Sequence, residues 1–207
     1  MESNALKISK IIFIVFCFLC GSKNLAQDVN GLASMADLDS TENLLRPYEG
    51  KLERILKTQL LGDINGDQIK DSALIQYKRV VAPDSTYVKE CGQNVCYIRI
   101  QFGSNIPEMI IEGYSLSVKS TFDINHDGKD EILIFRELQQ YNWGDLSLYS
   151  LYKNEWKLLG SVNVFLGDDE DYENRIVKSG GKFYIVEDAW NKDFSVISRK
   201  KVLIKTK

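Results

Sequence analysis

The sequence is poor in the residues on which many catalytic sites depend. It has one histidine, three prolines and, after position 20, two cysteines among 207 residues. It contains neither an H-E-x-x-H zinc motif nor a glycine-rich loop that could cradle a phosphate group. With 44% hydrophobic residues and no low-complexity run, the chain predicts one globular domain rather than domains strung on linkers. The net charge of −3 gives no electrostatic footprint for nucleic acid.

A long hydrophobic run is also absent. The longest, over residues 11–20, has ten apolar residues, whereas a membrane span needs about 20. Lys7 and Lys10 precede this run, and small and polar residues follow it. This order is typical of a secretory signal, so we predict a signal peptide over residues 1–26 and no membrane span. The protein would then be periplasmic, on the cell surface or secreted, with lipid attachment at Cys20 as the alternative.

The two remaining cysteines, Cys91 and Cys96, bracket four residues. In an exported chain an even pair at short range predicts a disulfide, here at the end of a hairpin. Closing so small a loop would contribute about 2 kcal/mol on the chain-entropy model. A metal or redox role for the two thiols is the alternative, but no further Cys or His stands beside them.

The rest of the chain has the texture of a β protein. From residue 51 onward, short runs rich in Val, Ile, Tyr and Phe alternate with turn residues, and no long window keeps the 3.6-residue apolar period of a helix. We predict an all-β antiparallel meander over 51–207, with turns at 153–155 and 179–181, behind a loosely ordered segment over 27–50. The last predicted strand is basic and is expected to be an edge strand with solvated lysines. The predicted strands cover residues 72–81, 96–103, 108–118, 131–138, 146–153, 156–165, 174–179, 182–188 and 195–204.

An internal repeat holds the most regular acidic clusters. The segment GDINGDQIKDSALIQY begins at Gly62, and FDINHDGKDEILIFRE begins 60 residues later at Phe122. Both copies contain D-I-N-x-D, both place another acid four residues on, and both lead into an apolar strand. Repetition at this period indicates blade-like meander units placed side by side.

The second copy predicts a calcium site. Its side chains at loop positions 1, 3, 5 and 9 all carry oxygen, and alternate positions of a tightly wound loop can turn toward one point. Gly128 at position 6 permits the left-handed backbone that reverses the chain. An all-oxygen set favours Ca²⁺ over Zn²⁺ or Mg²⁺, the alternative being a solvated acidic turn. The predicted ligands are Asp123, Asn125, Asp127 and Glu131 through their side chains and Lys129 through its carbonyl, with the Lys129 ammonium in water.

The first copy predicts a weaker site. Its position 6 is Gln68, and a left-handed glutamine costs about 1 kcal/mol, although Gly66 at position 4 could relax the loop instead. Neither copy is an EF-hand, because position 12 is Leu74 in one and Ile134 in the other instead of glutamate. The corresponding ligands are Asp63, Asn65, Asp67 and Asp71 through their side chains and Ile69 through its carbonyl.

The pattern D-x-N-x-D-G-x-x-E/D followed by an apolar strand resembles the calcium loop of FG-GAP repeats, the blade units of integrin-like β-propellers. It is similar to the loop of VCBS-type repeats in exported bacterial proteins. The resemblance covers two segments of roughly sixteen residues each and implies Ca²⁺ as the cofactor. A full propeller needs more blades than the residues after position 50 supply. We therefore expect a partial propeller or a compact β domain.

Little else in the sequence points to chemistry. The only histidine, His126, falls inside the second loop, where a base beside a cation is poorly placed. Tyr141 and Trp143 stand in an apparent loop and are candidate contacts for an unknown protein or glycan partner.

The leading hypothesis is an exported calcium-binding protein that acts as a binding or scaffolding module and not as an enzyme. One alternative is a periplasmic inhibitor or immunity-type protein directed against a secreted hydrolase such as a lysozyme-like enzyme. Another is a hydrolase that acts through a carboxylate pair such as Asp168 and Glu173.

Overall fold

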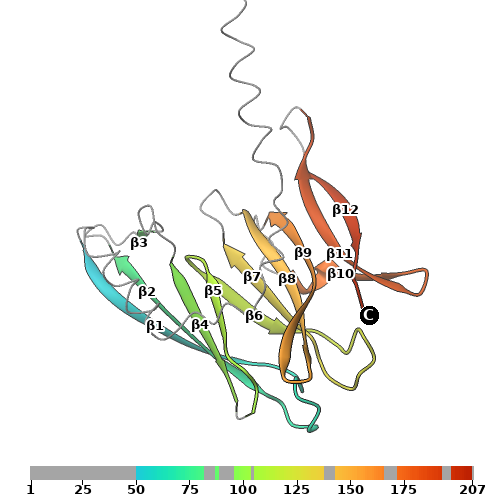
Figure 1. Cartoon of the computed structure of the whole chain (residues 1–207). Coiled ribbons are helices and arrows are strands. Elements are labelled where there is room, and N and C mark those ends of the chain that lie inside the picture. Colours follow the sequence, from blue (N-terminus) through green and yellow to red (C-terminus); the bar gives the residue numbers. More distant parts are fainter. Residues whose placement is uncertain are drawn as a thin grey trace, which may run out of the picture. The chain divides into compact units, whose positions relative to one another are not determined.

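The computed structural model describes residues 50–81, 87–88, 96–103, 105–137, 143–165, 172–192 and 197–206. Within these ranges the chain forms β-strands and one short 3₁₀ helix, with no α-helix (Figure 1). The elements are β1 (Lys51–Leu60), β2 (Ser72–Val81), β3 (Tyr87–Val88), β4 (Tyr97–Phe102), β5 (Met109–Glu112), β6 (Leu116–Ser120), β7 (Ile132–Glu137), β8 (Trp143–Tyr152), β9 (Glu155–Phe165), η1 (Tyr172–Arg175), β10 (Ile176–Ser179), β11 (Lys182–Trp190) and β12 (Ile197–Leu203).

The strands form three open antiparallel sheets, in chain order. Sheet A has the order β1-β2-β4-β5, with β3 beside β2; sheet B has the order β6-β7-β8-β9; and sheet C has the order β10-β11-β12. Every pairing is antiparallel. The predicted all-β meander is confirmed, while the interpretation of the sheets as propeller blades stays a prediction.

Sheet B contributes to both hydrophobic cores, which explains the apolar strand after the second acidic loop. Along β7, Ile132 and Ile134 belong to a core shared with sheet A. Leu133 and Phe135 belong to a second core that includes Ile185 of sheet C. Because successive side chains of a strand point to opposite faces, a strand covered on both sides has to be apolar throughout.

Both predicted hairpin turns are present. Lys153 and Asn154 join β8 to β9 with φ of 50° and 64°, and Gly180 and Gly181 join β10 to β11 with φ of 56° and 74°. Two central residues with positive φ suit the right-handed twist of the flanking strands.

Two strand predictions are wrong. Residues 51–60 were not among the predicted strands, yet they form β1, which pairs with β2 along its whole length. The predicted strand 108–118 is two strands in different sheets, with the chain turning at Gly113. A β-carbon on Gly113 would lie 2.9 Å from the Arg136 side chain, so the turn packs too closely for a larger residue.

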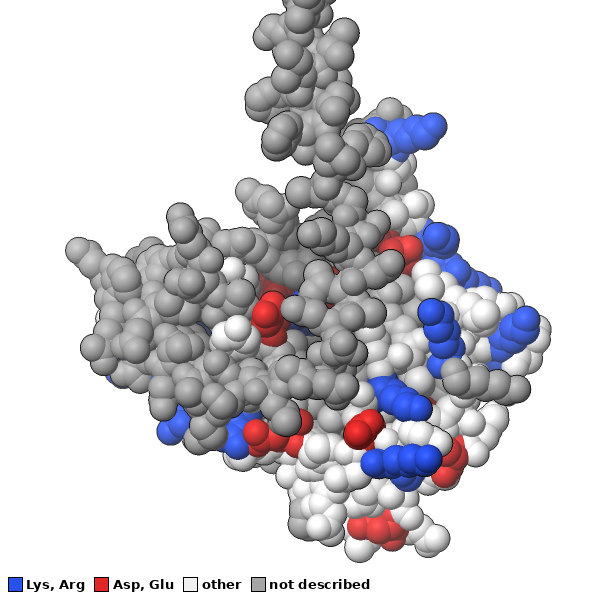
Figure 2. Space-filling view, viewed as in Figure 1, with Lys and Arg blue, Asp and Glu red and all other residues white. Residues whose placement is uncertain are grey.

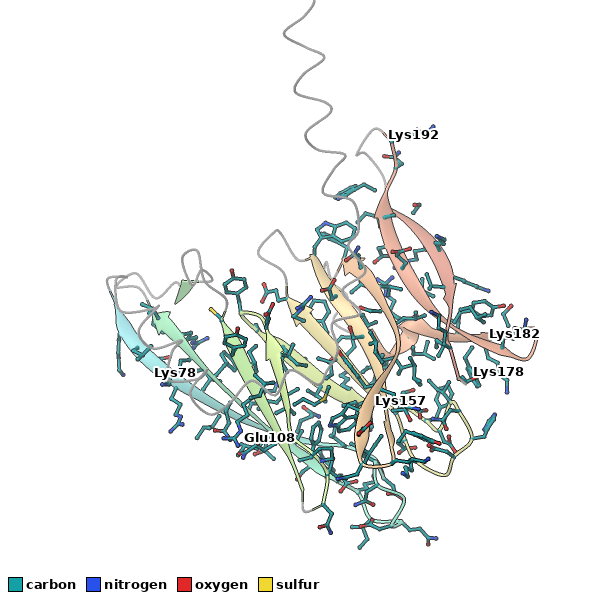
Figure 3. The ribbon with its side chains drawn as sticks, in the orientation of Figure 1. Lys78, Glu108, Lys157, Lys178, Lys182 and Lys192 are labelled. Carbon is teal, nitrogen blue, oxygen red and sulfur yellow. The ribbon has the colours of Figure 1, made fainter. Side chains whose placement is uncertain are left out.

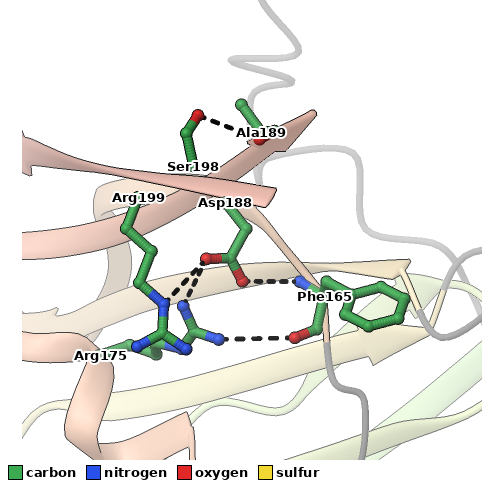
Figure 4. Close-up of polar contacts among 6 residues, drawn as sticks. All are labelled: Phe165, Arg175, Asp188, Ala189, Ser198 and Arg199. Atoms are coloured by element: carbon green, nitrogen blue, oxygen red, sulfur yellow. Dashed lines mark hydrogen bonds and ion pairs between the residues drawn. The ribbon is translucent and has the colours of Figure 1, made fainter. Parts of the chain in front are cut away.

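A buried ion pair between η1 and β11 is hydrogen-bonded to the end of β9 (Figure 4). The Asp188 carboxylate accepts hydrogen bonds from Arg175 Nη1 at 2.7 Å and from the backbone N–H of Phe165 at 3.0 Å. Arg199, whose side chain is 65% exposed, approaches the same carboxylate at 3.4 Å. The Asp188 and Arg175 side chains are buried, so this pair fixes the position of β11 against β9.

Charge is distributed unevenly among the sheets. The described residues 172–192 and 197–206 carry eight Lys or Arg and three Asp or Glu, although the whole chain has a net charge of −3. Figure 2 shows basic side chains gathered on the side of the view where sheet C lies. Lys178 and Lys182 project from the β10–β11 hairpin (Figure 3). β12 is an edge strand with exposed lysines, as the sequence predicted.

Several predictions fall on residues outside these ranges: the signal peptide over 1–26, the segment 27–49, Cys91, Tyr141 and Asp168. They stay predictions. Cys96 is described and is buried directly before β4. In the part of the chain that is described, no helix is long and apolar enough to cross a membrane.

Candidate metal centre

The two acidic loops occupy equivalent places in two sheets. The first connects β1 to β2 and the second connects β6 to β7, so each joins the first strand of its sheet to the next. Each is closed at its base by the same backbone hydrogen bond. The N–H of Leu61 donates to the Asp71 carbonyl, and the N–H of Thr121 donates to the Glu131 carbonyl, both at 2.8 Å. The repeat seen in the sequence is therefore a structural repeat.

The first acid of each loop organises the backbone that follows it. The Asp123 carboxylate accepts hydrogen bonds from the N–H groups of Asp127 at 3.1 Å and Gly128 at 2.9 Å. In the first loop, Asp63 accepts from Asp67 at 3.1 Å and Gln68 at 2.7 Å. Short polar side chains commonly bond their own backbone in this way, and here they hold each loop tightly wound.

Both loops need two residues with left-handed backbone, and each supplies one glycine. At position 4 the first loop has Gly66 with φ of 84°, and the second has His126 with φ of 62°. At position 6 the order reverses, with Gln68 at 67° and Gly128 at 85°. The sequence left open whether Gln68 would be left-handed or whether Gly66 would relax the loop instead; the structure shows that both positions are left-handed in both loops.

The second loop brings three carboxylates together. Oxygen atoms of Asp123, Asp127 and Glu131 all lie within 4.8 Å of one another. Asn125, the remaining predicted side-chain ligand, donates from Nδ2 to Glu131 Oε1 at 2.8 Å and thus lies beside the same group. The sequence predicted that these four side chains would converge, and the structure places them together.

Glu131 is the unusual member, because its side chain is fully buried. Its Oε2 atom accepts a hydrogen bond from the N–H of Ile124 at 2.6 Å. Burial is the largest influence on this carboxyl and raises its pKa from 4.5 to about 7. The N–H of Ile124 and the hydroxyl of Ser150 lower the pKa, while the charges of Asp127 and Asp123 raise it. A buried anion beside two further anions is a site that a cation would stabilise.

The half-buried Lys129 side chain makes a contact that the sequence did not predict. Its ammonium was expected in water, but Nζ donates to the carbonyl oxygen of Leu151 in β8 at 3.2 Å. The backbone N–H of Lys129 donates to Asp127 at 3.2 Å. The loop is thus tied to the end of β8, which is the strand that also supplies Ser150.

The first loop lacks the same convergence. In the described part of the chain, the second loop alone groups three acids closely enough to hold one ion. Asp71 accepts the same backbone hydrogen bond as its counterpart Glu131, here from the N–H of Ile64 at 2.9 Å, but its side chain is one methylene shorter. Asn65 donates to Asp67 at 3.1 Å instead of to the ninth position. Ile69, predicted to offer its carbonyl, has an exposed side chain. A weaker first site stays the prediction.

The two loops touch each other through a residue that the sequence analysis did not select. Asp130, at position 8 of the second loop, accepts a hydrogen bond from the N–H of Asp63 at 3.1 Å and donates its own N–H to the Asp63 carbonyl at 2.7 Å. A β-carbon on Gly62 would lie 1.8 Å from the Asp130 carboxylate, so glycine is required there. Gly62 is visible in the sequence, but only the fold shows what it faces.

The remaining candidates have other roles. Trp143 was expected in a loop, but it begins β8, and its ring packs against Phe165 and Trp190 at centroid distances of 5.6 and 5.9 Å. His126 is exposed, with its ring edge-on to an aromatic ring of sheet C at a centroid distance of 6.4 Å. Glu173 forms an ion pair with a lysine of β6 at 3.1 Å.

The fold and the loops define an all-β protein of three antiparallel sheets with two equivalent acidic loops. No protein-family model, no curated protein and no solved structure matches the chain.

Proposed function

We propose that the protein is an exported calcium-binding β-repeat protein that acts as a binding or scaffolding module. The proposal is supported above all by the convergence of Asp123, Asp127 and Glu131 within 4.8 Å. These oxygens come from a loop whose turns are already closed by its own hydrogen bonds, so little chain entropy would be lost when an ion binds.

Calcium is the ion that suits these donors. Carboxylate, amide and carbonyl oxygens form a hard ligand set, and Ca²⁺ accepts six to eight of them in flexible geometry. Asp123, Asn125, Asp127 and Glu131 would bind through side chains and Lys129 through its carbonyl. The ion would neutralise a buried carboxylate at the point where sheet B meets both of its cores, and it would therefore stabilise the sheet as well as the loop.

A binding role is favoured over catalysis by the position of His126. It is the chain's single histidine, it is exposed on the second loop, and its ring lies against that of Phe183. A general base needs a partner that orients it and a substrate proton within reach. At its position in the second loop, the His126 imidazole would lie beside the bound cation and not beside a substrate.

Thermal unfolding with and without calcium tests the proposal. Extracellular modules bind Ca²⁺ with dissociation constants of about 10⁻⁴ to 10⁻³ M. At ten times the dissociation constant, binding adds about 1.4 kcal/mol, or roughly 3 to 6 °C for a domain of this size. Superimposable melts in excess chelator and in 10 mM calcium would contradict the proposal.

A matched pair of variants locates the site. Asp127→Asn keeps an acceptor for the N–H of Lys129 but removes one charge from the three converging carboxylates. The increase in melting temperature on adding calcium should therefore be largely lost. Asp67→Asn makes the same change in the first loop and should leave most of the shift. Equal losses in the two variants would place the ion elsewhere. Magnesium at the same concentration should produce a smaller shift, because it gives up its waters reluctantly.

A further inference from the structure

The two acidic loops contact each other through one short segment of the second loop. Asp130, at position 8, binds both backbone polar groups of Asp63. Its carboxylate accepts the Asp63 N–H at 3.1 Å, and its own N–H donates to the Asp63 carbonyl at 2.7 Å. A β-carbon on Gly66 would lie 3.3 Å from the Lys129 side chain, so this glycine of the first loop packs against the residue before Asp130. The loop between β1 and β2 is thus bound to the loop between β6 and β7 at residues 129–130.

The segment that makes these contacts also holds two ligands of the proposed calcium site. Lys129 would bind the ion through its carbonyl at position 7, and Glu131 through its side chain at position 9. Asp130 lies between them in the chain, so an ion that fixes both neighbours also fixes the backbone of Asp130. At position 8 the second loop therefore contacts the first loop, while the residues on either side face the ion.

Asp63 is the residue on which the turn of the first loop depends. Its carboxylate accepts hydrogen bonds from the N–H groups of Gly66 at 2.7 Å, Asp67 at 3.1 Å and Gln68 at 2.7 Å. A shift of the Asp63 backbone would move an acceptor that these three backbone groups share. A continuous path therefore runs from the proposed ion through Asp130 and Asp63 to the turn of the first loop.

Close packing makes this path stiff. The N–H of Gly62 donates to Ser120 Oγ, at the end of β6, at 2.8 Å. A β-carbon on Gly62 would lie 1.8 Å from Asp130 Oδ2, closer than two unbonded atoms can come. Asp130 therefore has little room to move without moving the first loop, and a close-packed contact transmits such a displacement.

We propose that Asp130 couples the two loops, so that calcium bound by the second loop also orders the first. The inference rests on the proposed calcium site and adds an effect of that site on sheet A. Without an ion, repulsion among the three acids of the second loop loosens residues 129–131. With the ion, Asp130 is fixed and holds Asp63 in place. Because coupling between two sites is reciprocal, an ordered first loop in turn raises the affinity of the second for calcium.

The two copies of the repeat differ at the position that joins them. Position 8 of the first loop is Lys70, whose side chain is exposed, whereas Asp130 is half-buried. A lysine side chain could not accept the N–H of Asp63, because an ammonium group only donates. The link therefore depends on the acid of the second copy, and Lys70 offers a matched control.

Amide hydrogen exchange, followed by NMR in chelator and at rising calcium concentration, tests the coupling. Calcium in the second loop should protect the amides of that loop at Asp127 and Gly128. The first-loop amides of Gly66 and Gln68 should exchange about tenfold more slowly as well, with the same calcium midpoint. Asp67→Asn weakens any binding of calcium to the first loop itself, and it should keep this response.

Substitutions at position 130 separate the hydrogen bond from the charge. In Asp130→Ala the second loop should stay protected by calcium, the first loop should lose its response, and the calcium dissociation constant should rise about fivefold. Asp130→Asn removes the same charge but retains an acceptor oxygen, so most of the first-loop response should remain. Gly62→Ala displaces the Asp130 carboxylate and should behave as Asp130→Ala does. Lys70→Ala changes position 8 of the other loop and should leave the response in place.

The outcomes distinguish the coupling from the calcium site itself. If calcium protects neither loop, the proposed calcium site is wrong and the coupling falls with it. If calcium protects the second loop but leaves exchange in the first loop unchanged, the coupling alone is overturned. A first-loop response that survives in Asp130→Ala, or that persists in Asp127→Asn, would also overturn it, because the ion would then act on the first loop directly.

Discussion

The buried carboxyl of Glu131 should make the metal-free protein less stable as the pH rises. Burial raises its pKa to about 7, whereas the carboxyl in the unfolded chain keeps the ordinary pKa of 4.5. Between these two values the folded protein holds a proton that the unfolded chain has released. The contribution of Glu131 is therefore most favourable below pH 4.5 and is lost as the pH rises through 7.

The size of the effect follows from the two pKa values. A difference of this size corresponds to about 3 kcal/mol over the full range, of which about 2.5 kcal/mol falls between pH 5 and pH 8. Calcium would compete with the same proton. Its apparent dissociation constant should be about tenfold weaker at pH 6 than at pH 8, and one proton should be released on binding at the lower pH.

Urea unfolding in chelator, followed by the fluorescence of the chain's three tryptophans, measures how the stability of the metal-free protein changes with pH. Other carboxyl groups also titrate, so the quantity to compare is the difference in unfolding free energy between the wild-type protein and Glu131→Gln. The glutamine amide has one acceptor oxygen where the carboxylate has two. The lost hydrogen bond lowers the free energy of unfolding of the variant by about 1 to 3 kcal/mol, by the same amount at every pH.

The change with pH isolates the charge. Relative to the variant, the wild-type protein should lose about 2.5 kcal/mol between pH 5 and pH 8. Calorimetric titration in buffers of different ionisation enthalpy measures the proton released by calcium. A wild-type minus variant difference that stays constant with pH would refute the reasoning.

Three further predictions concern packing and backbone. Asp188→Asn should lower the free energy of unfolding by about 3 to 5 kcal/mol, because it leaves a buried guanidinium without its counter-charge. Arg199→Ala removes an exposed partner of the same carboxylate and should lower it by less than about 1 kcal/mol. Urea unfolding at pH 7 measures both changes. Gly144→Ala should cost about 1 to 3 kcal/mol, because the new methyl would meet a buried ring at 2.1 Å. Gly160→Ala, whose methyl would have ordinary contacts, serves as its control. Gln68→Gly should raise the melting temperature in chelator by relieving about 1 kcal/mol of left-handed strain, and an unchanged or lower melting temperature would contradict this account.

The sequence predicted most of the strands because their apolar periodicity is local. It failed at β1, where Leu52, Ile55 and Leu56 have the spacing of a helical face and the residues between them are good helix formers. Pairing with β2 overrides that preference. It also failed at 108–118, because a periodic apolar run does not reveal where the chain leaves one sheet for another.

The candidate site was predictable for a similar reason, since its ligand positions lie within nine residues of one another. What could not be predicted are contacts made over long sequence separations. Ser150 reaches Asn125 from β8, and Asp130 reaches Asp63 across 67 residues. Neither contact leaves a pattern in the sequence, because each depends on which strands become neighbours.

By itself the sequence determined an all-β chain with two copies of one acidic loop, because alternation along a strand and the turn chemistry of Asp, Asn and Gly act over a few residues. The tertiary structure decided which loop gathers its acids. Burial and one additional methylene bring Glu131 to the other two acids of its loop, whereas the shorter Asp71, which accepts the equivalent backbone hydrogen bond, is not grouped with the acids of the first loop. It also decided where charge and apolar surface are exposed, since both depend on which strand becomes an edge.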